Sequence, residues 1–149
     1  MKRIMFTVLS LLVMASITAG IAWAQNPSFN KLSATTTGNT LTVNFKLTGL
    51  GNATTVDVTL SDEFDFTCTS RGKSGTQTTS AHQTINQTTT FSVGPKPGTS
   101  SGTVSFEATC PGSQTASGAI FRNVSISATA STGSAGPVAI TGPSGEILV

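Results

Sequence analysis

The chain has 149 residues, and its formal charge of +2 arises entirely from Lys2 and Arg3. From residue 25 onward six basic residues balance six acidic ones, so this part carries no net charge. A neutral chain lacks the basic surface that attracts nucleic acids and anionic membranes, which excludes both classes of partner. The 125 residues from residue 25 suit one domain and leave no room for two.

Residues 1–24 predict a cleaved secretory signal peptide. A basic start is followed by an apolar run over residues 4–20, and Ala22, Ala24 and Gln25 form the cleavage site. The alternative is an uncleaved anchor, because residues 4–24 are long enough to cross a bilayer. No basic stop signal follows Gln25, which favours cleavage. We therefore expect an extracellular or periplasmic protein with no stable membrane insertion after cleavage.

The composition after residue 24 favours β-structure. Thr is the commonest residue, at 25 of 125, and it fits the solvent face of a pleated sheet better than a helix. Val, Leu, Ile and Phe together supply 26 of the 125 residues, close to the roughly 20% below which a chain rarely forms a core. A disordered chain of this kind usually carries a high net charge, which this one lacks.

Apolar and polar residues alternate along several short runs, as they do in half-buried strands. Residues 41–47 and 56–60 alternate in this way on either side of a turn at 49–52, and they predict a hairpin whose apolar faces point the same way. Further strands are predicted at 29–36, 64–68, 84–93, 104–110 and 120–126. About six or seven short strands separated by turns predict a two-sheet antiparallel sandwich.

Two segments interrupt the alternation. Continuing it past Leu60 points Asp62 inward, and because a lone buried carboxylate is costly, we expect a bend or bulge at Ser61–Glu63. Residues 70–80 are polar and rich in Gly and Thr, and they predict a loop.

We place the sandwich domain at residues 25–130. The Gly/Ser/Pro-rich tail at 131–149 is either an edge strand or disordered.

Cys68 and Cys110 are the only cysteines, and both take the inward parity of nearby Phe residues. An isolated pair in an exported chain predicts a disulfide, and the absence of a Cys-x-x-Cys motif argues against redox catalysis. The 43-residue closed loop implies about 4 kcal/mol of stabilisation in the chain-entropy model.

No constellation of catalytic groups is visible, so we predict a protein that is not an enzyme and needs no cofactor. His82, the only histidine, lies in a polar segment that we interpret as an exposed loop, and nothing in the sequence fixes a catalytic partner for it. Asp57, Glu63 and Asp65 share the outward parity and form a weak candidate for calcium, which binds several oxygen ligands. Simple solvation of these carboxylates is the alternative.

Arg71 and Lys73 follow Cys68 in the predicted loop and are the candidate binding residues for an acidic partner. A rigid sandwich projects its loops for binding. We therefore expect binding at one end of the domain, in the loops at 71–79 and 94–101.

Four short segments carry a resemblance. They are Leu50-Gly51-Asn52, the strand that ends in Cys68, Cys110-Pro111, and Phe121-Arg122-Asn123-Val124. The chain resembles small exported bacterial proteins of uncharacterised function. The resemblance implies a secreted immunoglobulin-like β-sandwich without catalytic residues.

Two functions follow as hypotheses. The first is a secreted, non-enzymatic surface or binding module that recognises an extracellular protein or a glycan. The second is a self-assembling structural subunit, pilus- or coat-like, that associates through edge strands. Fimbrial subunits are similar in length, Thr content and single disulfide. Their cysteines lie earlier in the chain, and residues 145–149 here lack their C-terminal aromatic residue.

Overall fold

The computed structural model describes residues 26–95 and 98–140. These residues form seven strands and no helix. In chain order the strands are β1 (Ser28–Thr37), β2 (Thr40–Thr48), β3 (Thr55–Gly72), β4 (Gly75–Ser92), β5 (Ser100–Glu107), β6 (Thr115–Ala130) and β7 (Gly133–Ala139). The predicted all-β class is confirmed.

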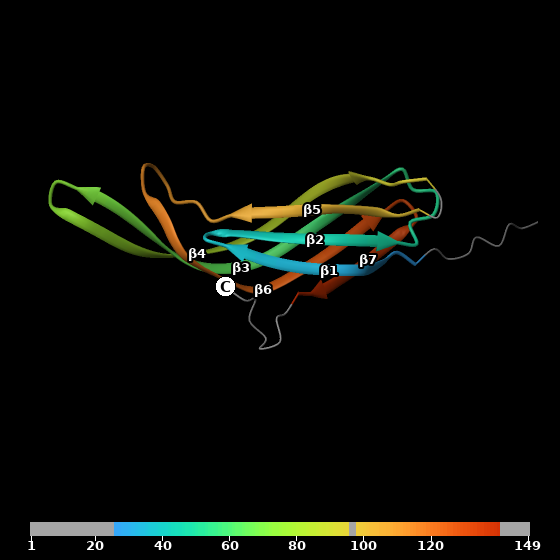
Figure 1. Ribbon diagram of the computed structural model, residues 1–149, viewed down its shortest axis with the longest axis horizontal. Coiled ribbons are helices and arrows are strands. Elements are labelled where there is room, and N and C mark those ends of the chain that lie inside the picture. The colour runs from blue at the N-terminus through green and yellow to red at the C-terminus, as the bar shows by residue number, and fades with distance from the viewer. Residues whose placement is uncertain (1–25, 96–97, 141–149) are drawn as a thin grey trace, which may run out of the picture.

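The strands form two antiparallel sheets that face each other (Figure 1). One sheet has the order β1-β2-β5 and the other has the order β4-β3-β6-β7. All five strand pairings are antiparallel. The two-sheet arrangement with one disulfide agrees with the prediction from the alternating pattern.

The predicted hairpin between residues 41–47 and 56–60 is wrong, because β2 and β3 belong to different sheets. The connection at residues 49–54 crosses between the sheets, and Leu50 is fully buried within it. Gly49 has a φ of +75°, and a Cβ there would lie 2.5 Å from the carbonyl oxygen of Asn26. Glycine is therefore required at this crossing. The apolar faces of β2 and β3 meet across the core instead of lying side by side.

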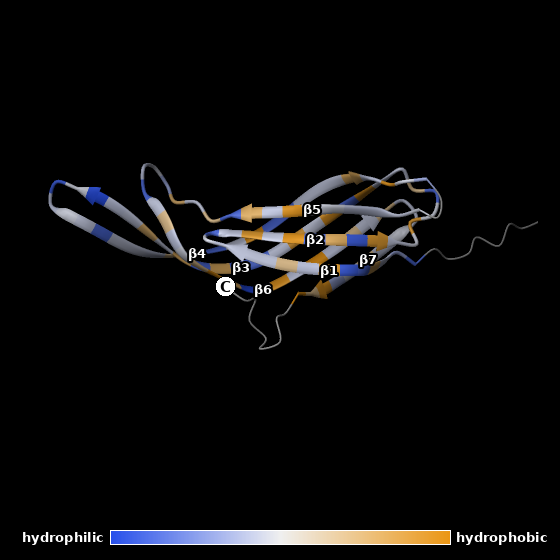
Figure 2. Ribbon diagram, viewed as in Figure 1, coloured by the Kyte–Doolittle hydropathy of each residue, from blue (hydrophilic) through white to orange (hydrophobic). Residues whose placement is uncertain are grey.

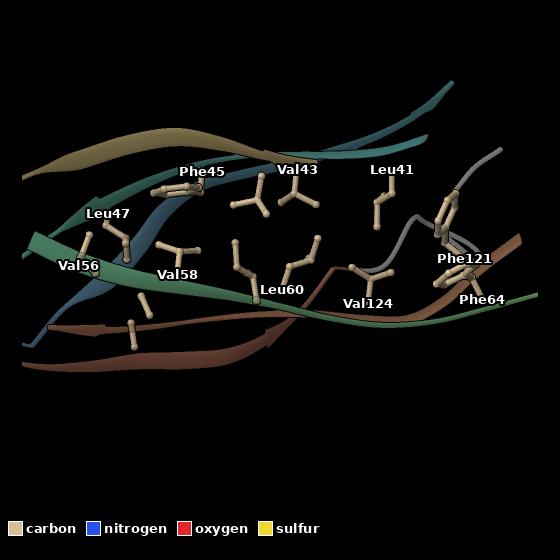
Figure 3. Close-up of a cluster of buried hydrophobic side chains, with 14 of the residues drawn as sticks. Leu41, Val43, Phe45, Leu47, Val56, Val58, Leu60, Phe64, Phe121 and Val124 are labelled. Carbon is tan, nitrogen blue, oxygen red and sulfur yellow. The ribbon is translucent and has the colours of Figure 1, made fainter. Parts of the chain in front are cut away.

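The core lies between the central strands of the two sheets (Figure 3). Alternate residues of β2 point toward alternate residues of β3 and β6, which is the arrangement that a period of two produces. Phe64 packs against Phe121 and Phe106, with ring centroids 5.5 and 4.9 Å apart. The fully buried large apolar residues are Leu41, Val43, Leu47, Leu50, Val56, Val58, Leu60, Phe64, Phe121, Val124 and Ile126.

The β3–β4 hairpin projects beyond the three-stranded sheet (Figure 1). Its strands pair without a register shift from Thr55↔Ser92 to Gly72↔Gly75. The predicted loop at residues 70–80 is therefore wrong, since only the turn at Lys73–Ser74 interrupts the ladder. Figure 2 shows few strongly apolar segments in the projecting part. Among the described residues no strand of the other sheet extends over it, and both of its faces are polar, so the usual alternation is missing.

A bulge interrupts the regular alternation of β6 near Arg122. Pairing with β3 shifts between Ser61 and Glu63, where β6 contains an additional residue. Asn123 has a φ of +51° at this point, a backbone conformation that Asn adopts more readily than most residues. The bulge lets Phe121 and Val124 both point inward.

The last described strand, β7, pairs with β6 and forms one edge of the four-stranded sheet. It lies within the segment that the sequence assigns to a C-terminal tail. The predicted signal peptide with its cleavage site at Ala22, Ala24 and Gln25 lies outside the described residues, as do residues 141–149.

Candidate functional site

The disulfide marks one end of the candidate site. Cys68 near the end of β3 is bonded to Cys110 in the segment between β5 and β6, with Cα atoms 5.8 Å apart, so the predicted pairing is confirmed. The bond attaches the β5–β6 connection to the projecting part of β3. The Asn39 side chain adds a hydrogen bond to the carbonyl of Ala116, and Ala108 donates its backbone N–H to the carbonyl of Asn39 (2.9 Å). A disulfide is typical of an oxidising, extracellular or periplasmic environment.

A shallow pocket of about 570 Å³ lies at this end of the four-stranded sheet. Four of the five lining side chains come from the neighbouring strands β3 and β6. Cys68 points into the core, so the odd-numbered residues beside it on β3 point outward. The lining residues are Thr69 and Arg71 from β3, Ser113 from the β5–β6 connection, and Thr115 and Ser117 from β6. Four hydroxyl groups and one guanidinium therefore surround a space open to solvent.

Arg71 supplies the positive charge of this pocket. Its side chain is exposed, and within residues 26–95 and 98–140 it forms no ion pair. Ser117 is held by Thr67, whose Oγ1 lies 2.8 Å from the Ser117 hydroxyl and 2.9 Å from its carbonyl oxygen. Lys73, the other predicted binding residue, lies in the hairpin turn and does not line the pocket. Only Arg71 of the two is therefore placed to contact a ligand there.

A second hollow, of about 370 Å³, lies beside the disulfide. Its polar groups come from Asn39, Glu107, Thr109, Gln114 and Thr115, and Thr115 also lines the Arg71 pocket. Glu107 gives this hollow a negative group where the neighbouring pocket has a positive one. The end of the sandwich near the disulfide thus presents two polar depressions of opposite charge.

The second predicted binding segment lies elsewhere. The described part of residues 94–101 connects β4 to β5 at the opposite end of the sandwich from the hairpin turn (Figure 1). The 18-residue β4 separates the two segments. The expectation that both segments form one binding surface is therefore wrong, because that interpretation treated residues 75–80, the first third of β4, as part of a loop.

His82 lies on β4 and not in a loop. Its Nδ1 is 2.7 Å from Oδ1 of Asp65 on β3, and Arg122 Nη2 is 3.5 Å from the other oxygen of Asp65. The sequence did not identify Asp65 as the partner of His82, because their pairing depends on the register of an unpredicted hairpin. No hydroxyl among the described residues hydrogen-bonds to this imidazole. The pair lacks a positioned nucleophile, and it lies outside both depressions.

The three carboxylates of the calcium hypothesis share one face of β3 but have different partners. Asp57 accepts a hydrogen bond from Thr90 (2.6 Å), Glu63 accepts one from Asn123 (2.9 Å), and Asp65 faces His82. Within the part of the chain that the structure describes, no three His, Cys, Asp or Glu residues are grouped so that they would hold a metal ion.

Asp62 is the unusual carboxyl of the molecule. It is only 2% exposed, and neither of its oxygens has a hydrogen-bond partner. Burial raises its pKa from 3.8 to about 7. The nearby backbone N–H groups of Arg122 and Glu63 do not reach full hydrogen-bond geometry, so they oppose the rise only in part. Asp62 lines neither depression. It is a buried carboxyl of the core and not part of the candidate site.

The predictions did not include the polar groups contributed by β6 and by the connection before it. Thr115 and Ser117 precede the recognised strand at residues 120–126, and Ser113 follows Pro111-Gly112. The alternation of Thr115 and Ser117 could have predicted an earlier start of this strand, but a polar segment next to a turn resembles a loop. These residues reach Arg71 only through the long-range pairing of β3 with β6.

No protein-family model matches the chain, and no curated protein matches its sequence. The functional interpretation therefore depends on the geometry above. None of the described residues forms a helix with the length and apolarity needed to span a bilayer.

Proposed function

We propose that this protein is a secreted, non-enzymatic binding module that recognises an acidic oligosaccharide in the pocket around Arg71. The observation that supports it is the lining of that pocket: one exposed guanidinium without an ion-pair partner among the described residues, surrounded by four hydroxyl groups. A guanidinium binds a carboxylate through two parallel hydrogen bonds. The hydroxyl groups of Thr69, Ser113, Thr115 and Ser117 both donate and accept, as the hydroxyl groups of a sugar do.

An oligosaccharide fits this lining better than a protein partner does. Protein interfaces draw most of their affinity from buried aromatic and arginine side chains in desolvated pockets. None of the five lining residues is aromatic, and the pocket is open to solvent. A ligand whose surface consists largely of hydroxyl groups, with one carboxylate for Arg71, matches the groups that are present.

The fold is consistent with an exported immunoglobulin-like module. Immunoglobulin domains of the constant type place their strands in the orders A-B-E-D and C-F-G. The orders β1-β2-β5 and β3-β6-β7 correspond to A-B-E and C-F-G, with β4 paired to β3 in place of β5. The disulfide from β3 to the β5–β6 connection supports an oxidising environment after export. It does not occupy the usual inter-sheet position of antibody domains.

Binding of trigalacturonate and of neutral maltotriose, measured by calorimetry, tests the proposal. We expect the wild type to bind the acidic sugar, and Arg71→Gln to weaken this binding at least about tenfold, because a charged hydrogen bond contributes about 1.5–3 kcal/mol. Lys73→Gln is the matched control, since it removes one positive charge two residues away but outside the pocket. Its affinity should equal that of the wild type.

Two results would contradict the proposal. Equal losses in Arg71→Gln and Lys73→Gln would show that general charge attraction, and not the pocket, holds the sugar. Chromatographic detection of cleaved trigalacturonate, abolished by His82→Ala, would show an enzyme instead of a binding module.

A further inference from the structure

The edge strands of the two sheets differ in how they resist association. Exposed edges usually carry charges, prolines, bulges or a short strand, because unpaired backbone groups attract other strands. β1 has Lys31 next to a register shift, β5 is eight residues long and ends in Glu107, and β7 is seven residues long and contains Pro137. Each of these three edges thus has at least one protective feature.

β4 has none of these features. It is 18 residues long, contains no Lys, Arg, Asp, Glu or Pro, and pairs with β3 without a bulge. No strand among the described residues pairs with its other edge. Its only titratable side chain, His82, is directed to Asp65. At its C-terminal end the carbonyl of Ser92 accepts a hydrogen bond from the Ser100 hydroxyl (2.9 Å). The rest of this edge is long, unbroken by a bulge and uncharged.

The side chains of β4 also fit a second copy of themselves. The residues on its outer face read Thr76, Thr78, Ser80, His82, Thr84, Asn86, Thr88, Thr90, Ser92. An antiparallel pairing centred on Thr84 places Thr78 opposite Thr90, and Ser80 opposite Thr88. Cross-strand Thr–Thr and Thr–Ser pairs are favourable, and this register brings no like charges together because His82 lies opposite Asn86.

We propose that β4 pairs antiparallel with β4 of a second copy of this chain, with the two-fold axis at Thr84. The same pairing repeated by symmetry joins the two four-stranded sheets into one sheet of eight strands. The interface is closed, because each copy uses its only β4 edge, so the product is a dimer and not a fibre. This dimer is independent of the proposed sugar pocket, since Arg71 lies on β3.

Cysteine cross-linking of the exported chain tests the register. Residues opposite each other in an antiparallel pair have Cα atoms about 4.5–5.5 Å apart, within the range that a disulfide spans. Thr84→Cys alone should form a covalent dimer under mild oxidation, because the residue meets its own copy at the axis. Thr78→Cys alone should not, but a mixture of Thr78→Cys and Thr90→Cys should. Thr129→Cys, exposed on the outer face of β6 and two strands from the edge, is the control.

Light scattering provides a second readout that does not depend on cross-linking. The wild type should have twice the mass of one chain, and Thr84→Lys should be monomeric because two lysines meet at the axis. Thr129→Lys should remain dimeric, and matching circular dichroism spectra would show that both variants fold. A monomeric wild type, a larger open-ended assembly, or equal cross-linking at positions 78, 84 and 129 would overturn the proposal.

Discussion

Asp62 shows how a single side chain departs from the pattern of its strand. Alternation along β3 directs every even-numbered residue from Val56 to Cys68 into the core, and Asp62 follows it. The sequence-based expectation of a bend or bulge at Ser61–Glu63 is wrong, because β3 runs unbroken through these residues and the additional residue at this position lies in β6. From the sequence we expected the Asp62 carboxyl not to point inward, because burying a charge is costly. The raised pKa removes much of that objection, because the group is largely neutral below about pH 7.

This pKa predicts a pH dependence of stability. The folded protein binds the Asp62 proton more tightly than the unfolded chain does, so this contribution is complete below pH 3.8 and is lost as the pH rises to about 7. The loss is on the order of 4 kcal/mol. Asp62→Asn should match the wild type near pH 4 and be more stable at pH 8. Urea denaturation at pH 4, 6 and 8 measures the difference.

Asp57→Asn is the control for this experiment, because Asp57 is an exposed carboxyl on the same strand that accepts a hydrogen bond from Thr90. Its difference from the wild type should vary little over the same pH range. If Asp62→Asn were no more stable than the wild type at pH 8, the carboxyl would have a partner or a water molecule that keeps it ionised without cost.

The β3–β4 hairpin contains strand residues that the alternation of apolar and polar residues does not reveal. Period-two alternation identifies a strand only where one face is buried and the other is exposed. In residues 75–80 both faces are exposed, so the sequence shows an unbroken polar run. This absence of contrast led to the wrong loop at 70–80 and to the wrong environment for His82. Arg71 was selected from the sequence, but three of the four hydroxyl residues around it lie more than 40 residues later in the chain and reach it only through the pairing of β3 with β6.

The disulfide should contribute most to the stability of this projecting region. It joins residues 42 apart, and the chain-entropy model gives about 4 kcal/mol for such a loop. The double variant Cys68→Ala/Cys110→Ala should lose about this free energy of unfolding in urea. Reduced wild type is the matched control and should behave like the variant. An unchanged denaturation midpoint in both would mean that the packing of β3 against β6 alone holds this end together.

The fold class of the whole molecule could be predicted from sequence, but the assignment of strands to sheets could not. Alternation, turn residues and the Thr content predict an antiparallel sandwich. They do not reveal that the chain crosses between sheets at residues 49–54, because a short Gly-rich connection also suits a hairpin. The need for glycine at position 49 becomes clear only from the structure, in which the carbonyl of Asn26 lies beside it.

Combining the two proposals has a consequence for the intact molecule. In the proposed dimer Thr76 of one copy lies opposite Ser92 of the other, so the two Arg71 pockets lie at opposite ends of the shared sheet. Sixteen strand positions separate them, which corresponds to roughly 50 Å. A polymer carrying repeated carboxylates would contact both pockets at once and gain affinity from the link between them.

The most direct test of the binding proposal is a nuclear magnetic resonance titration of the ¹⁵N-labelled protein with trigalacturonate. We predict that chemical shift changes concentrate at the five residues lining the pocket: Thr69, Arg71, Ser113, Thr115 and Ser117. Arg71→Gln should need at least about tenfold more sugar to reach the same changes. Shifts centred instead on Asp65, His82 and Arg122, or no shifts at a sugar concentration that saturates calorimetric binding, would contradict the assignment of function to this pocket.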